Sequence, residues 1–232
     1  MGPHEGGEQV VPVGPPVPAD LGPEMLDRAV RGELRGLSKE VADDVAVHLV
    51  AAGVLLDDDA ARSLEHARYA RARARRVGAV REAVGIAAYA AGEYAEALAE
   101  LRAARRMNGD ASGLAMIADC ERALGRPQQA LKALDDPDFA RLDAEDQLEV
   151  ILVIAGARRD LGQHDAALVA LERAGLTADP PAPSSARVWY AYADTLAEMG
   201  RSAEAATWFT RVAELDEDLD TDAAERVAEL TK

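Results

Sequence analysis

The stretch VREAVGIAAYAAGEYAEALAELRAARR, residues 80–106, contains the pattern that decides the fold. It is centred on Gly92, with a small residue seven positions before the glycine and an alanine five positions after it. Large apolar residues stand eight positions before and nine positions after the glycine. The same frame recurs around Gly125, Gly162 and Gly200, at intervals of 33, 37 and 38 residues. Repeats of this length are typical of solenoids built from stacked helix pairs, so we expect an all-α fold.

Each position of the frame has a steric role. The glycine permits the turn that reverses the chain, and the small residues let two helices cross closely. The large residues fill the gap to the next helix pair. The small positions hold Gly85, Ala118, Ala155 and Ala193 before the turn, and Ala97, Ala130, Ala167 and Ala205 after it. The large positions hold Val84, Ile117, Ile154, Tyr192, Leu101, Leu134, Leu171 and Phe209.

This frame resembles the tetratricopeptide repeat (TPR) over residues 40–215, and Tyr94, two positions after Gly92, adds to the likeness. The resemblance implies a right-handed superhelical solenoid of antiparallel helix pairs, with about five repeats. A degenerate first copy is expected around Gly53, with two extra residues before Ala60. Pro127 and Pro137 stand where the family has no proline, so the second helix after Gly125 should be short. The run of residues 46–109 is also similar to uncharacterised TPR proteins of high-GC bacteria, which implies no activity.

Beyond the repeats, the chain is predicted to have a tail and one domain. Residues 1–23 are rich in proline and glycine, which predicts a disordered tail, and residues 24–232 are predicted to form a single helical repeat domain. Ser38 should cap a helix that runs to about Gly53, and three aspartates at 57–59 precede the next helix. Proline-bearing insertions at 135–138 and 179–184 account for the longer intervals. Residues 221–230 are predicted to form a helix that caps the last repeat.

Composition favours a soluble, cytoplasmic protein. The net charge of −16 argues against generic binding to nucleic acid or to an anionic membrane. The N-terminus lacks the apolar core of a signal peptide, and the longest apolar run, residues 45–56, is too short to cross a bilayer. Cys120 is the only cysteine, which rules out an internal disulfide.

In a solenoid of this kind the first helix of each pair lines the concave groove. Positions three, six and ten before the turn glycine share one face of that helix. The candidate binding residues at these positions are Glu82, Tyr89, Asp119, Arg122, Arg159, Tyr190 and Asp194. Arg122 and Arg159 are equivalent and could bind a carboxylate or phosphate of a peptide. The alternative, which we favour, is that they pair internally with Asp119 and Asp160.

A second candidate surface is the basic run over residues 62–81, which holds seven arginines and one glutamate. Arg68, Arg71 and Arg75 share one helix face. This patch could bind an acidic partner, an RNA backbone or the protein's own acidic C-terminal segment. We favour a solvated outer helix face, because only Tyr69 interleaves with the arginines and single-strand stacking needs several aromatic rings.

No pattern of catalytic, metal or cofactor chemistry is found. Asp218 to Glu229 superficially resembles a calcium loop, but Ala223 replaces the required glycine. A helix pair could bring His48 and His66 close together, where packing is a more ordinary role than metal binding. Cys120 is predicted to be buried. The chain has no phosphate-binding glycine loop and no nucleophile elbow, so we expect no enzyme and no cofactor.

The leading hypothesis is therefore a non-catalytic adaptor or scaffold that binds a protein or peptide in the groove. The alternative is a regulatory or RNA-associated protein that uses the basic run, and its affinity should fall steeply with salt. Self-association through an exposed end of the solenoid is a third hypothesis, which the mass in solution tests.

Overall fold

The computed structural model describes residues 14–109, 111, 113–176, 185–215 and 221–231. Over these residues the chain is helical and contains no strand, which confirms the all-α prediction. Residues 1–13 of the predicted tail and the acidic run at 216–220 lie outside the described residues. The helices fall into two compact units, Met1–Gly109 and Asp110–Lys232. The sequence predicts a single repeat domain over residues 24–232. Whether the two units form one such domain stays a prediction.

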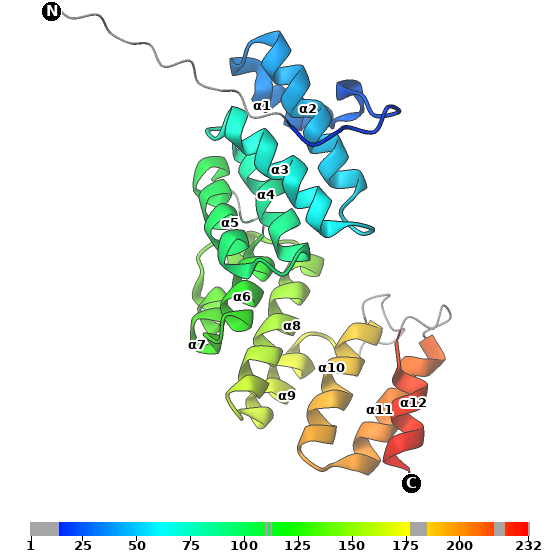
Figure 1. The fold of residues 1–232 in the computed structure, drawn as a ribbon. Helices are drawn as coiled ribbons and strands as arrows, with labels where there is room; N and C mark the ends of the chain where they lie inside the picture. The colour runs from blue at the N-terminus through cyan, green and yellow to red at the C-terminus, as the bar shows by residue number, and fades with distance from the viewer. Residues whose placement is uncertain (1–13, 110, 112, 177–184, 216–220, 232) are drawn as a thin grey trace, which may run out of the picture. The chain divides into compact units, whose positions relative to one another are not determined.

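The first unit contains α1 to α5 and two short 3₁₀ helices (Figure 1). These elements are η1 (Pro23–Met25), α1 (Arg28–Glu33), η2 (Leu34–Gly36), α2 (Lys39–Val54), α3 (Ala60–Ala74), α4 (Gly78–Ala90) and α5 (Tyr94–Asn108). Helices α2 and α3 pack as one pair, and α4 and α5 pack as the next. Ser38 caps α2 through its side chain, as the sequence predicted, and the side chain of Asp59 caps α3.

The second unit contains α6 to α12. Its elements are α6 (Leu114–Ala123), α7 (Pro127–Ala130), η3 (Leu131–Asp135), η4 (Phe139–Arg141), α8 (Ala144–Asp160), α9 (His164–Arg173), α10 (Ser185–Glu198), α11 (Ser202–Leu215) and α12 (Ala223–Leu230). Three helix pairs follow one another, α6 with α7, α8 with α9 and α10 with α11, and α12 packs against α11 (Figure 1). The short second helix after Gly125 and the terminal helix are both confirmed.

The four frame glycines end their helices in the same way. Gly92, Gly125, Gly162 and Gly200 have φ between 70° and 76°, in the left-handed region where a side chain is strained. In each turn the glycine N–H donates to the carbonyl three residues back, and the next N–H donates to the carbonyl five residues back, at 2.8–3.0 Å. These two bonds form a Schellman cap that satisfies the last carbonyls of the helix.

Gly53 does not make a turn of this kind. It lies inside α2, which continues to Val54, and the Leu55 N–H donates to the Ala51 carbonyl. The chain instead reverses over the five residues before α3, and the side chain of Asp59 caps that helix. The degenerate first copy is present as the α2–α3 pair, with Leu64 and Ala67 buried, but its turn contains no glycine.

The frame positions form the cores of the pairs. All four alanines after the glycines are fully buried, as are the large residues Leu171 and Phe209. A β-carbon at Gly85 would lie 2.6 Å from Leu101, so a larger residue there would push α4 and α5 apart. The exception is Leu134, which is 36% exposed. Its helix changes to 3₁₀ geometry at Leu131, so Leu134 lies off the face that its equivalents occupy.

Candidate functional site

The predicted groove residues divide between the two units. Glu82 and Tyr89 lie on α4 of the first unit, where the Tyr89 ring meets Tyr94 edge to face at 5.9 Å between centroids. Asp119 and Arg122 lie on α6, Arg159 on α8, and Tyr190 and Asp194 on α10, all first helices of pairs in the second unit. In the structure Asp119 and Arg122 belong to one group of ion pairs, Arg159 and Asp194 belong to a second, and Tyr190 bonds to Asp222.

Ion pairs connect α6 with α8, α8 with α10 and α10 with α12, and we call this series of contacts the ladder. The Arg122 Nε donates to Asp160 at the end of α8 at 2.6 Å, and its Nη1 reaches Asp119 at 3.3 Å. The Arg159 Nη2 donates to Asp194 and to Glu198 on α10, at 2.5 Å each. Arg226 on α12 donates to the other oxygen of Asp194 at 2.9 Å.

The structure shows which carboxylates of this chain contact these two arginines. Arg122 pairs with Asp119 and Asp160, as the favoured alternative predicted. Arg159 does not pair with Asp160, because adjacent residues on a helix point in different directions. It pairs with Asp194 and Glu198 of the next first helix instead. Both guanidinium groups are therefore engaged by carboxylates of this chain.

Hydrogen bonding stabilises the charged forms of these groups. Burial alone would lower the pKa of Arg122, but its bonds to Asp160 and Asp119 outweigh that effect and the pKa is raised. The bond to Glu198 raises the pKa of Arg159, and the same bond lowers the pKa of the Glu198 carboxyl. These pKa shifts favour the charged forms of Arg122, Arg159 and Glu198.

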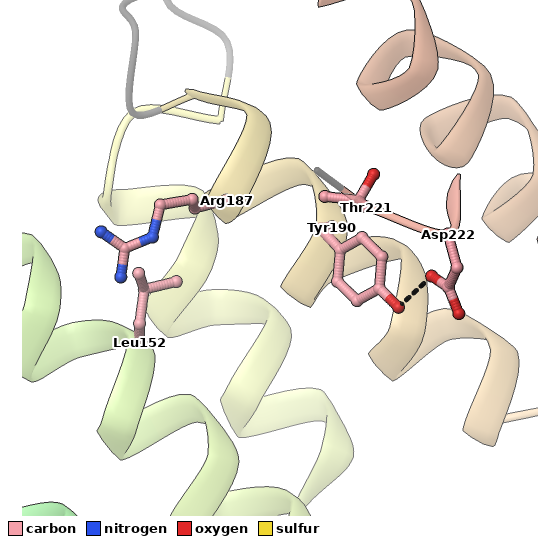
Figure 2. Close-up of a pocket in the computed structure, with 5 residues that line it drawn as sticks. All are labelled: Leu152, Arg187, Tyr190, Thr221 and Asp222. Carbon is pink, nitrogen blue, oxygen red and sulfur yellow. Dashed lines mark hydrogen bonds between the residues drawn. The ribbon is translucent and has the colours of Figure 1, made fainter. Parts of the chain in front are cut away.

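Beside the ladder lies a pocket of about 460 Å³, lined by Leu152, Arg187, Tyr190, Thr221 and Asp222. Figure 2 shows Leu152 and Arg187 on one side of this pocket and Tyr190, Thr221 and Asp222 on the other. The Tyr190 hydroxyl donates to the Asp222 carboxylate at 2.6 Å. Burial and this bond together raise the pKa of Tyr190 to about 12, so the hydroxyl stays protonated. We call this hollow the Tyr190 pocket.

The walls of the Tyr190 pocket are mixed in chemistry. The side chain of Leu152 and the ring of Tyr190 are apolar, and Tyr190 meets Phe209 edge to face at 5.2 Å between centroids. The Arg187 guanidinium is 57% exposed and is held by both oxygens of Glu149, one of them at 2.6 Å from Nη2. The pocket can therefore accept an apolar side chain with a polar group at its rim.

Sequence reasoning located this pocket only in part. Leu152 and Tyr190 are both ten positions before their turn glycines, so the repeat frame placed them on equivalent faces. Arg187 is three residues before Tyr190, one helical turn along α10, and that spacing was a usable signal. Thr221 and Asp222 lie outside the repeat frame, and no spacing could have assigned them to the pocket.

The basic run of the first unit is largely neutralised. Arg68 donates to Glu96 on α5 at 2.5 Å, and Arg71 donates to Glu96 and Glu100 at 2.9 and 2.6 Å. Arg75 is exposed at the end of α3, and its carbonyl accepts from the side chain of Arg81. Arg68 and Arg71 are thus not on a purely solvated face, because both reach across to α5.

The two central histidines meet as the sequence suggested. The Nδ1 atoms of His48 and His66 lie 2.8 Å apart in the core between α2 and α3. Gly14 packs over this pair, since a β-carbon there would lie 2.9 Å from the rings of His48 and Tyr69. Within the described ranges no three His, Cys, Asp or Glu side chains are placed to hold a metal ion. Cys120 is buried, as predicted.

Comparison with known protein families gives a match that includes residues of the Tyr190 pocket. Residues 186–219 match the family model of the tetratricopeptide repeat. This segment is thus similar to a tetratricopeptide repeat. It spans α10 and α11, the pair built around Gly200, and includes Arg187, Tyr190 and Asp194. A comparison with curated proteins finds no match to the chain. Among the described helices none is both long and apolar enough to span a membrane.

Proposed function

We propose that this chain is a non-catalytic adaptor that binds a protein or peptide on the first-helix face of its second unit. The observation that carries the proposal is the Tyr190 pocket, which opens on a TPR-type helix pair beside a rigid ladder of ion pairs. TPR-type repeats commonly bind other proteins through such faces. The high-GC bacterial source and the cytoplasmic location remain expectations from the sequence.

The contacts suggest how a partner would bind. An apolar side chain of the partner would pack between Leu152 and the Tyr190 ring, where its burial is favourable. A carbonyl or carboxylate of the partner would accept from the exposed Arg187 guanidinium. In this proposal Arg122 and Arg159 hold α6, α8 and α10 in register, and Asp194 links them to α12.

Affinity capture from native lysate tests this function with two pocket variants. Leu152→Glu places a charge in the pocket, and Thr221→Trp fills it from an exposed position without removing a core side chain. Val54→Glu, at a residue of α2 that is 56% exposed and lies outside this pocket, is the matched control. We expect mass spectrometry to identify partners held by the wild type and the control and lost by both pocket variants. Partners held equally by all four proteins would refute the pocket assignment.

The alternative role of the basic run in RNA binding makes a separate prediction. Arg68, Arg71 and Arg81 of this run already pair with Glu96 and Glu100, and an added RNA would meet a chain of net charge −16. We expect labelled poly(U) to show no binding in fluorescence polarisation at low salt. Binding that weakens steeply with salt and is lost in Arg75→Gln would favour the RNA role instead.

A further inference from the structure

Helix α7, the second helix of the α6–α7 pair, is much shorter than the second helices of the other pairs. Helix α7 has only four residues, whereas the second helices α5, α9 and α11 have 15, 10 and 14. Pro127 starts α7, the chain continues as the 3₁₀ helix η3, and Asp136 turns to extended geometry before Pro137. A residue before proline is excluded from helical geometry, so the helix cannot resume there.

The shortened helix leaves a hollow of about 430 Å³ over α8 and α9, which we call the α7 hollow. Its apolar lining comes from η3, η4, α8 and α9 and consists of Leu134, Phe139, Ile151, Ile154, Ala166, Val169 and Ala170. Leu134 and Val169 are 36% and 45% exposed, although Leu101, Leu171 and Phe209, the equivalents of Leu134, are buried. The hollow thus exposes an apolar side chain at a frame position whose equivalents are buried in the other repeats.

The charged residues around the α7 hollow indicate what it would bind. Arg158 and Arg173 line it, and neither has a carboxylate partner among the described residues. In the described part of the second unit the other arginines pair with carboxylates, except Arg211, which stacks on Trp208 at 4.5 Å. The two remaining arginines therefore lie at the same apolar hollow.

Arg158 also has an unused donor. Its Nε is buried and has no hydrogen-bond partner within the described structure, and its Nη1 makes only a long contact of 3.4 Å with Gln163. A buried donor without an acceptor is unfavourable, so the Arg158 side chain would gain by turning toward an acceptor that a partner brings. Asp165 lies at the same rim, but it is in the first turn of α9, where the helix dipole already compensates its charge.

We propose that the α7 hollow is a second docking site, which binds a peptide segment carrying a large apolar side chain next to a carboxylate. The apolar side chain would pack on Ile151 and Val169, and the carboxylate would accept from Arg158 and Arg173. The complementarity between two uncompensated arginines and an acidic group selects this partner over a purely apolar one. This site is independent of the Tyr190 pocket, since the two share no lining residue.

A displayed library of random 12-residue peptides tests the proposal against the full chain. The library is first depleted on Val169→Glu, so that only peptides needing the α7 hollow remain, and is then selected on the wild type. We expect enriched peptides to carry Leu, Ile, Met or Phe with Asp or Glu within two positions. The affinity of a labelled enriched peptide should fall at least tenfold for Arg158→Gln/Arg173→Gln and stay unchanged for Thr221→Trp.

A double-mutant cycle completes the test. Changing the acidic residue of the peptide to its amide should weaken binding to the wild type about tenfold, yet have little further effect on the arginine double variant. Absence of enriched peptides, or enrichment without acidic residues, would overturn the proposal. So would a dimer in sedimentation that Val169→Glu dissociates, because a second copy would then be the occupant. Loss of binding in Thr221→Trp would overturn it too, because the selected peptide would then occupy the Tyr190 pocket.

Discussion

Gly162 and Gly53 both have open space where a β-carbon would stand, but their backbone conformations differ. Gly162 has a φ of 70°, whereas Gly53 lies within α2. We therefore expect Gly162→Ala to lower the free energy of unfolding by about 1 kcal/mol, because alanine is strained in the left-handed region. Gly53→Ala should raise it by about 0.5 kcal/mol, because alanine favours the helix. Urea denaturation followed by circular dichroism measures both, and equal effects would contradict this assignment.

His66 makes stability depend on pH. Burial, with the nearby His48 and Arg62, lowers the pKa of His66 from 6.5 to about 4. The unfolded chain takes up this proton near pH 6.5 and the folded chain only near pH 4. The free energy of unfolding should therefore be fully present above pH 6.5 and fall by at most about 3 kcal/mol as the pH drops to 4.

Denaturation at a series of pH values checks this expectation, with His66→Gln as the comparison. The variant has no group that titrates at this position, so its stability should fall less over the same interval. Burial also lowers the pKa of His48, which acts in the same direction and remains in both proteins. Identical pH profiles for the two proteins would show that His66 is not the source of the effect.

At the scale of the elements, Arg159 connects two helix pairs. It is 21% exposed and bonds to both Asp194 and Glu198 on α10. Arg159→Ala would leave these carboxylates without that donor, so we expect a loss of about 1–3 kcal/mol in the free energy of unfolding. Arg201→Ala removes an exposed pair within one element and should have little effect. Thermal melts of both variants provide the measurement, and equal melting temperatures would show that the ladder contributes nothing.

The repeat frame predicted some features of the elements from the sequence and missed others. It located the helix pairs and the short α7, because turn glycines and prolines act on their own backbone. It did not predict that Leu134 would be exposed, because that depends on 3₁₀ geometry after Leu131. It did not predict the partners of Arg159, because these lie 35 and 39 residues further along the chain.

At the scale of the whole molecule, the chain consists of two compact units that meet in sequence at Gly109. The first unit has its own buried cluster around Leu34, Val45 and Leu49, and the second has a cluster around Leu171, Leu196 and Phe209. We expect residues 1–109 and 110–232, produced separately, each to be helical and to unfold cooperatively in urea. A fragment without helical circular dichroism would show that it needs the other unit to fold.

The sequence by itself determined the helix pairs, the positions of their turns and the small residues that let the helices cross. These features rest on local backbone geometry and on steric volume at fixed spacing, which a single chain segment expresses. Only the tertiary structure decided which carboxylates engage Arg159, and where the Tyr190 pocket and the α7 hollow open. Those features depend on side chains brought together from separate helix pairs, and so the surfaces proposed for binding became visible only when the helices had packed.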